Sequence, residues 1–327
     1  MFKPRNSDEL EFTEKPFYFS YSSLNKLVFC PKIFYNQYVL KQKEEQLQSY
    51  LVEGKVIHCL LLEGDKFNEQ FIISPLKLPS PSNKQLLDKL FTINQSNLKL
   101  NELKNEVLTL LVEIDLHQSL KTDEQRLAKI ITIENESYFN FLKESKSKII
   151  IDNSTFEKCK RATELIKENK DVKQNLVTES SWELLDCFNE HFLQYWDEEL
   201  GFGVKGIIDN IVVDYQNNVV TINDLKTTSK SIADFSDTVQ FYNYWLQAAI
   251  YVRLVQKVLL LDKKDWKIKF NFIVIDNYEQ VYCFPVSNES LTAWENKLSE
   301  KLEEAKSILN SGDFSLPYEF QTGTVIL

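Results

Sequence analysis

Glycine and proline, which most often interrupt helices and strands, are unevenly distributed along this chain. Neither residue occurs between Pro81 and Gly201. So long a stretch without chain breakers, rich in leucine, lysine, glutamate, asparagine and isoleucine, predicts helices joined by polar turns. Residues 101–120 and 123–145 show apolar residues at helical spacing, and 154–172 begin with a Ser/Thr cap. We expect a helical elaboration that packs on a core and has no chemistry of its own.

The segments on either side of this interval have other periodicities. Residues 20–40 and 49–64 predict helices, with a break or a new helix start at Pro31, and 69–74 a short strand or extended exit. From Glu190 onward the pattern becomes typical of strands. The expected strands are 190–196, 202–215, 219–227, 266–277 and 280–287, and the expected helices are 238–261 and 289–312. Strands, a helix and further strands, framed by helices, indicate a mixed α/β or α+β domain.

The chain has 327 residues, enough for one large domain or two ordinary ones. We expect a single domain over 1–327, with N-terminal helices in 1–75, the helical elaboration in 76–188 and a β-sheet core in 189–327. The composition, 43 % hydrophobic and 26 % charged, is that of a soluble globular protein. No apolar run reaches the roughly 18 residues that span a bilayer. The N-terminus lacks the apolar core and cleavage site of a secretory signal.

Cysteine spacing indicates the redox environment of the protein, and net charge limits the kinds of partner that it binds. The five cysteines lie far apart without CxxC spacing, which indicates reduced thiols in a cytoplasm. The net charge is −10. This acidity works against sequence-independent DNA binding, because such binding depends on lysine and arginine neutralising phosphates. A carboxylate metal site also adds negative charge where a nucleic-acid enzyme works, so the charge does not exclude DNA as a partner.

The most hydrophobic hairpin, KGIIDNIVVDYQNNVVTINDLKTT (205–228), contains charged residues where a buried strand is normally apolar. Asp224 and Lys226 share one face because residues two apart in a strand point the same way. Asp209 lies across the turn, where an antiparallel register brings it near Asp224. Close carboxylates repel unless a positive charge lies between them, and Mg²⁺ is the natural candidate. The alternative is that Asp224 and Lys226 face solvent while Asp209 caps a bend.

Two further features belong with this hairpin. The helix expected after it places Tyr244, Gln247 and Tyr251 on one face. The opposite, apolar face is formed by Phe241, Trp245, Ala248 and Val252. The polar stripe is either a wet edge of the core or, directly after Asp-x-Lys, the substrate-facing wall of a site. His58, four residues after Gly54 in an apolar helix, is either a hydrogen-bonded core histidine or a further ligand of a divalent metal.

These motifs together resemble a known family. Asp209, then NDLKTT, then QAAIY resemble the PD-(D/E)xK nuclease superfamily, in the branch where a Q-x-x-x-Y helix follows the core, as in RecB-type nucleases. YSSLNKLVFCPKIFYNQYV, followed by VEGKVIHCLLLEGDKFNEQFIIS, is similar to the opening of the exonuclease VIII (RecE-like) phage recombination nucleases. The likeness runs in order from about Tyr18 to Tyr251 and is weakest through the helical middle.

The resemblance implies a restriction-endonuclease-like core, a central mixed sheet flanked by helices, with a helical N-terminal half. Carried over by position, it assigns the metal ligands to His58, Asp209, Asp224 and the backbone carbonyl of Leu225. Lys226 is then the catalytic lysine, acting with Asp224 and Asp209.

The resemblance also implies an acid upstream of the hairpin. Glu190 matches this acid best and Glu179 is the alternative. We group Glu190 with Gln247, Tyr251 and Tyr244 on the substrate-binding side of the site.

The activity implied by the resemblance is that of a Mg²⁺-dependent exonuclease, with Mn²⁺ as a possible substitute. It hydrolyses DNA from duplex ends in phage-type recombination or repair, in the cytoplasm of a bacterium or phage-infected cell. A homo-oligomeric ring and a single-strand annealing protein are further partners by resemblance. The Cys30–Pro31 pair also occurs in iron–sulfur relatives, but those relatives need a C-terminal cysteine cluster that this sequence lacks. No iron–sulfur cluster is therefore expected. A structure-specific or nicking endonuclease and a catalytically silent binding module remain alternatives.

Overall fold

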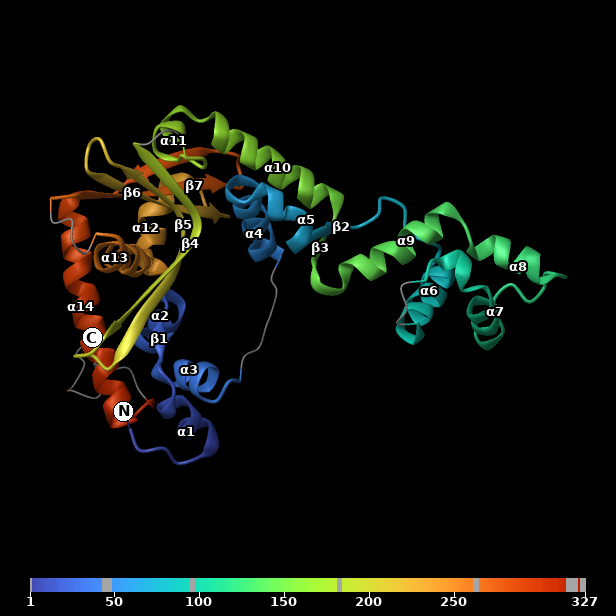
Figure 1. Ribbon diagram of the computed structural model, residues 1–327, viewed down its shortest axis with the longest axis horizontal. Coiled ribbons are helices and arrows are strands. Elements are labelled where there is room, and N and C mark those ends of the chain that lie inside the picture. Colours follow the sequence, from blue (N-terminus) through green and yellow to red (C-terminus); the bar gives the residue numbers. More distant parts are fainter. Residues whose placement is uncertain are drawn as a thin grey trace. The chain divides into compact units, whose positions relative to one another are not determined.

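The computed structural model describes residues 2–42, 49–94, 98–180, 184–260, 265–315 and 323. The chain forms two compact units, Met1–Glu63 with Ala162–Leu327 and Gly64–Arg161. Figure 1 shows the sheet that forms the centre of the first unit and the helices that dominate the second. The expected single domain, with segments 1–75, 76–188 and 189–327, stays a prediction.

A mixed sheet forms the centre of the first unit (Figure 1). Its strands are β1 (Tyr18–Phe19), β4 (Leu185–Asp197), β5 (Phe202–Asp214), β6 (Val219–Thr228), β7 (Lys267–Asp276) and β8 (Val281–Pro285). β4, β5 and β6 are antiparallel neighbours, β6 and β7 are parallel, and β8 is antiparallel to β7. The short β1 pairs in parallel with β5, on the edge of β5 opposite β4. β6 pairs with the same edge further along the strand. The predicted mixed sheet is confirmed.

Helices cover the sheet of the first unit. They are α1 (Ser7–Glu14), α2 (Tyr21–Phe29), α3 (Pro31–Phe34), α4 (Ser49–Leu62), α11 (Lys170–Asn175), α12 (Phe235–Phe241), α13 (Tyr244–Leu254) and α14 (Asn288–Ser311), with 3₁₀ turn η5 (Ile232–Asp234) and π-helical turns η1 (Tyr35–Val39) and η6 (Val255–Leu259). Ser20 and Ser23 form a reciprocal cap at the start of α2. The predicted break is confirmed, because α2 ends at Phe29 and Pro31 begins α3.

The single helix predicted over 238–261 is wrong, because α12 ends at Phe241 and α13 begins at Tyr244. Between them Asn243 has φ +57°, in the left-handed region that a continuous right-handed helix cannot contain. Of the predicted apolar face, Trp245, Ala248 and Val252 are buried as expected, whereas Phe241, which lies before the break, is 72 % exposed. In the predicted polar stripe, Gln247 and Tyr251 are buried and Tyr244 is half-buried.

The second unit is mostly helical and has its own apolar core. Its helices are α5 (Phe67–Gln70), α6 (Pro81–Ile93), α7 (Lys104–Glu113), α8 (Asp123–Ile130) and α9 (Ile133–Glu144), with 3₁₀ turns η2 (Gly64–Lys66), η3 (Leu100–Glu102) and η4 (Ser145–Ser147). α10 (Asn153–Glu168) contains the boundary between the units. β2 (Phe71–Ile73) pairs in parallel with β3 (Ile149–Ile151), a strand that the prediction missed inside the glycine- and proline-free interval. Its three isoleucines are β-branched and favour a strand over a helix.

Four asparagines form a ladder across the middle of the sheet. Asn189, Asn210, Asn223 and Asn271 are direct cross-strand neighbours on β4, β5, β6 and β7. Each amide nitrogen donates to the next amide oxygen, at 2.8 Å from Asn210 to Asn189, 2.8 Å from Asn223 to Asn210 and 2.9 Å from Asn271 to Asn223. This asparagine ladder also binds the end of α11, because Asn223 donates to the carbonyl of Asn175.

Two general features complete the fold. Within the described ranges, no helix is both long enough and apolar enough to cross a membrane. The five cysteines, all within the described ranges, form no disulfide with one another, and Cys59, Cys159 and Cys283 are buried. The expectation that the chain binds no iron–sulfur cluster stays a prediction.

Candidate active site

The pairing of β5 with β6 ends where the two predicted aspartates lie. The last cross-strand pair is Asn210 with Asn223, so Asp209 and Asp224 are the next residues on the two strands. Beyond this pair a side chain replaces the backbone acceptor, because Asp209 Oδ2 accepts a hydrogen bond from the Leu225 amide at 2.7 Å. Both aspartates are buried, on the face of the sheet opposite the asparagine ladder. The two strands therefore separate at the site while their carboxylates stay together.

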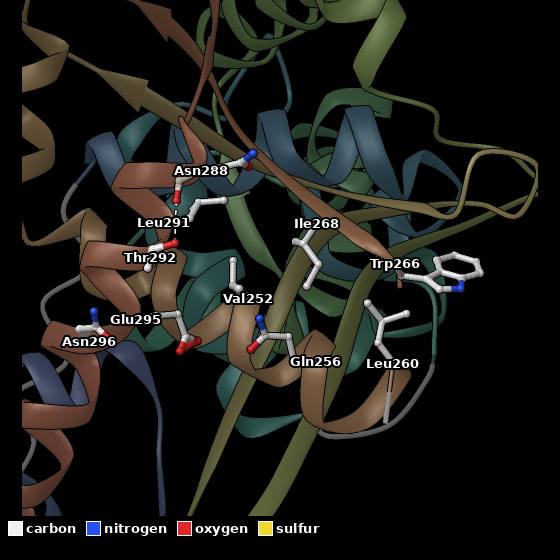
Figure 2. A pocket seen from close by; sticks show the side chains of 10 residues that line it. All are labelled: Val252, Gln256, Leu260, Trp266, Ile268, Asn288, Leu291, Thr292, Glu295 and Asn296. Carbon is white, nitrogen blue, oxygen red and sulfur yellow. Dashed lines mark hydrogen bonds between the residues drawn. The ribbon is translucent and has the colours of Figure 1, made fainter. Parts of the chain in front are cut away.

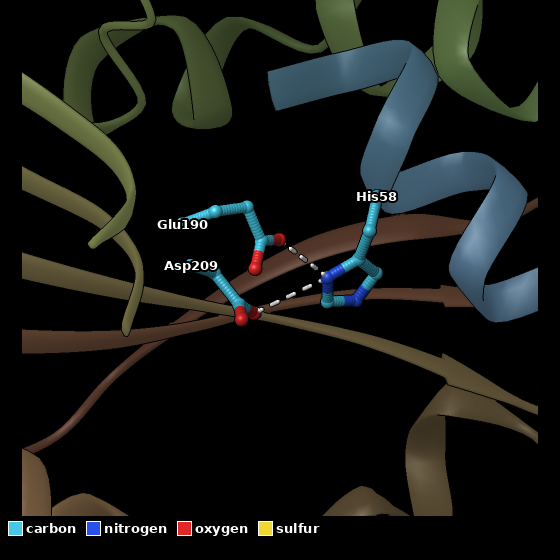
Figure 3. A group of neighbouring side chains, drawn as sticks. All are labelled: His58, Glu190 and Asp209. Atoms are coloured by element: carbon cyan, nitrogen blue, oxygen red, sulfur yellow. Dashed lines mark ion pairs between the residues drawn. The ribbon is translucent and has the colours of Figure 1, made fainter. Parts of the chain in front are cut away.

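Glu190 and His58 complete a compact group with Asp209 (Figure 3). The Nδ1 atom of His58 lies 3.5 Å from Glu190 Oε1 and 3.7 Å from Asp209 Oδ2. Glu190 has φ +45°, an uncommon backbone conformation for a residue other than glycine. It interrupts the regular pairing of β4 with β5 between Asn189 and His191. Such a conformation persists only where its surroundings impose it, and it occurs often at functional sites.

His58 reaches this group because α4 approaches β6 closely at Gly54. A Cβ atom at Gly54 would lie 3.2 Å from Thr227 Oγ1, tighter than most real contacts. His58, one helical turn later, then places Nε2 3.1 Å from the carbonyl oxygen of Leu225. In the neutral ring a proton on Nε2 donates to that carbonyl, and Nδ1 presents its lone pair to the two carboxylates. The glycine and the histidine act together, as their spacing in the sequence indicates.

Asp224 and Lys226 form a buried ion pair. The Lys226 Nζ lies 2.5 Å from Asp224 Oδ2, and Asp224 is fully buried. Apart from Lys226, neither oxygen of Asp224 has a hydrogen-bond or ion-pair partner among the described residues. The alternative of a solvent-facing strand end is therefore wrong for both residues.

Aromatic and amide groups of α13 line the same site. The Lys226 ammonium lies 4.8 Å from the centre of the Tyr244 ring, a cation–π contact. Gln247 Nε2 donates to Tyr251 OH at 2.8 Å, and both residues are buried. Burial, followed by the charges of Asp209 and Asp224, raises the pKa of Tyr251 well above its usual value, so this phenol stays neutral.

The charges in the group act against the effect of burial. Burial alone lowers the pKa of His58, but Asp209 and Glu190 outweigh it and raise that pKa. Burial raises the pKa of Asp224 to about 6, against the opposing charge of Lys226. Burial lowers the pKa of Lys226, but Asp224 and Asp209 outweigh it and keep the ammonium charged. Three carboxylates thus face one ammonium and one imidazole.

This donor set fits a divalent cation. One ligand atom each from His58, Glu190 and Asp209 lie within 4.8 Å of one another. Asp224 adds two carboxylate oxygens whose partner among the described residues is Lys226, and the Leu225 carbonyl lies against His58. Carboxylate and carbonyl oxygens with one imidazole suit Mg²⁺ or Mn²⁺. A cation here would replace mutual repulsion among the acids by attraction.

Two cavities of the first unit differ in whether they contain residues of the candidate site. A cavity of about 530 Å³ lies between α13, β7 and α14, lined by residues such as Val252, Gln256 and Ile268 (Figure 2). It contains none of the site residues. A cavity of about 400 Å³ includes Tyr251, Lys205 and the serine cap of α2, and it borders the unpaired edge of β5.

The structure brings together the residues expected to bind the metal, and it separates the two candidates for the upstream acid. Glu190 lies against His58, whereas Glu179 is exposed on the segment before β4. Sequence reasoning missed two features: the contact of Glu190 with His58, and the asparagine ladder behind the acids. The one available signal for the ladder was an asparagine beside each acid, in Asn189–Glu190, Asp209–Asn210 and Asn223–Asp224.

Comparison with known proteins gives a family. A search of curated proteins finds no match. A solved structure of a candidate exonuclease from Eubacterium rectale has a TM-score of 0.44 and 12 % identity, over 93 % of this chain and 87 % of that one, a distant likeness. The sequence profile of the PD-(D/E)XK nuclease superfamily matches residues 18–316, which include the hairpin, the Gln/Tyr helix and the His58 helix. The chain belongs to the PD-(D/E)XK nuclease superfamily.

Proposed function

We propose that this chain is a divalent-metal-dependent DNA exonuclease that hydrolyses phosphodiester bonds from duplex ends. Mg²⁺ is the proposed cofactor, and Mn²⁺ a substitute. The observation that carries the proposal is the convergence of His58, Glu190, Asp209 and Asp224 beside Lys226 on a sheet of this superfamily. Several acids buried close together destabilise a fold through desolvation and mutual repulsion, and a bound cation would offset this cost.

The proposed ligands are His58, Glu190, Asp209, Asp224 and the carbonyl of Leu225. When bound, the cation supplies charge that activates a water and stabilises the phosphate in the transition state. Lys226 holds its proton beside Asp224, so it neutralises charge on a phosphate oxygen or holds the attacking water. Tyr244 lies under the ammonium and fixes its direction. The Gln247–Tyr251 pair is neutral and buried, and it orients the strand or the lysine.

End dependence and biological setting rest on the resemblance to the exonuclease VIII group. By the same resemblance we propose a role in phage-type recombination or repair, a homo-oligomeric state and a single-strand annealing partner. A nicking or structure-specific endonuclease would use the same residues, so the substrate, not the site, separates the two activities.

The test is a digest of end-labelled linear duplex DNA, with closed circular DNA as the control and Mg²⁺ or EDTA in parallel. Loss of the linear DNA alone, only with Mg²⁺, is the expected result. Cleavage of the circle would replace the exonuclease by an endonuclease, and cleavage of neither would leave a silent binding module.

Matched variants tie the activity to the site. Asp209→Asn keeps the shape of the side chain but removes a proposed ligand charge, so we expect it to lose cleavage and the Mg²⁺-induced rise in Tm. Glu300→Gln, an exposed acid on α14, is the control and should behave as the wild type.

A further inference from the structure

A row of aromatic rings leads outward from the lysine of the site. Lys226 Nζ lies 4.8 Å from the centre of the Tyr244 ring. Tyr244 is stacked on Tyr242, with ring centres 5.6 Å apart and planes at 26°. Tyr242 in turn meets Phe241 edge to face, with ring centres 4.9 Å apart. We call Tyr244, Tyr242 and Phe241 the aromatic ledge.

The outer part of the aromatic ledge is open to solvent and carries a cation. The side chain of Phe241 is 72 % exposed and that of Tyr242 is 45 % exposed, whereas Tyr244 is half-buried. The exposed Lys230 places Nζ 5.1 Å from the centre of the Phe241 ring. A single exposed apolar side chain needs no explanation, but contiguous rings with a lysine at each end form a distinct surface.

A bend of the chain at Asn243 exposes these rings. Asn243 adopts its left-handed conformation with two side-chain hydrogen bonds: its Nδ2 donates to Asn25 Oδ1 at 2.8 Å, and its Oδ1 accepts from Trp245 Nε1 at 2.9 Å. Tyr21 OH donates to the carbonyl of Tyr242 at 2.5 Å. A continuous helix would have placed Phe241 on the face of Trp245. The bend instead turns Phe241 and Tyr242 outward.

We propose, on the basis of the proposed function, that the aromatic ledge binds unpaired bases at the DNA end by stacking. Lys226 and Lys230 then contact phosphates of the same strand. Bases stack on aromatic side chains irrespective of sequence, and lysines beside the rings follow the backbone, which is the usual combination in single-strand binding. The positive charge is local, so it is compatible with the net charge of −10. The ledge begins at the lysine of the site, so a strand stacked on it leads to the place of cleavage.

The test measures binding in EDTA, so that no strand is cut. The probes are a duplex with a short unpaired overhang that contains 2-aminopurine, whose fluorescence falls on stacking, and a blunt duplex of the same length. The variants are Phe241→Ala/Tyr242→Ala, Phe241→Trp and Phe241→Leu. Tyr278→Ala, which removes an aromatic side chain that is 70 % exposed on the β7–β8 turn, is the control. Each variant is first shown to have the wild-type Tm, as expected for exposed side chains.

The wild type should quench the 2-aminopurine and bind the overhang more tightly than the blunt end. The double variant should lose the quench and bind the overhang about tenfold more weakly, with little change for the blunt duplex. Phe241→Trp should keep the quench and Phe241→Leu should weaken it, because stacking needs a ring and not only an apolar group. Tyr278→Ala should match the wild type.

Two results would overturn the proposal: an unchanged quench in the double variant, or an equal loss of affinity for overhang and blunt duplex. The second result would assign the ledge to duplex DNA. The cleavage assay in Mg²⁺ is independent of this binding test. A wild type that cuts while the ledge variants bind normally refutes only the ledge, and one that stacks the overhang but never cuts refutes only the nuclease.

Discussion

Replacing Asn223 by alanine tests how strongly the asparagine ladder supports the site. The change removes three hydrogen bonds, two donated by Asn223 to Asn210 and Asn175 and one accepted from Asn271. The Asn210 oxygen and the Asn271 nitrogen then stay inside the sheet without these partners. At about 1–3 kcal/mol for each of these two orphaned buried groups, the free energy of unfolding should fall by about 2–6 kcal/mol. This is a large share of the about 5–15 kcal/mol that stabilises a typical domain.

The assay is urea unfolding followed by circular dichroism, with Asn296→Ala on the exposed side of α14 as the control. A surface substitution of this kind changes stability by about 0.5 kcal/mol or less. Because Asn223 precedes Asp224, Asn223→Ala should also weaken Mg²⁺ binding, measured by calorimetry under conditions where the variant is folded. A loss of stability below about 1 kcal/mol would show that water replaces the amide, and that the ladder does not hold the strands as argued.

Three further predictions concern the site itself. Lys226→Ala should abolish cleavage and, because it leaves the buried Asp224 without its ion-pair partner, should lower the Tm in EDTA with partial recovery in Mg²⁺; a wild-type Tm in EDTA would contradict the buried pair. Since the pKa of Asp224 is raised from 3.8 to about 6, the folded metal-free protein holds this proton more tightly than the unfolded chain. The contribution of Asp224 to stability should therefore fall as pH rises from about 4 to 6, and Mg²⁺ affinity should rise over the same range. Asp224→Asn should remove the first trend and weaken the second, to which the loss of the His58 proton also contributes. Gly54→Ala should weaken metal binding by pushing α4, and with it His58, away from Thr227, and Gly54→Ala/Thr227→Ala should restore it, as measured by titration calorimetry.

The sequence predicted those parts of the site that depend on local periodicity. Asp224 and Lys226 share a face because strand residues alternate, and the short turn sets the register that brings Asp209 to Asp224. His58 was assigned by resemblance, and its contact with Leu225 depends on the approach of α4 to β6. That approach is a tertiary contact that Gly54 permits but does not dictate.

The sequence did not predict the features that depend on one backbone conformation or on side-chain pairing between strands. The left-handed Asn243 breaks an otherwise continuous helical pattern, since asparagine is tolerated both in helices and in the left-handed region. That single residue decides whether Phe241 faces the core or solvent. The conformation of Glu190 is likewise invisible in the alternation of β4, although its position at the site depends on it.

The asparagine ladder explains why the site needs polar residues on both faces of its sheet. The apolar pattern alone cannot fix the register of β5, because the adjacent residues Ile211 and Val212, which point to opposite faces, are both buried. A slip by one residue would exchange the faces at little hydrophobic cost and would point Asp209 away from His58. The amides remove this degeneracy, since each nitrogen meets the next oxygen only in the observed register. Because Asn210 and Asn223 directly adjoin Asp209 and Asp224, the same register that satisfies the amides brings the carboxylates together.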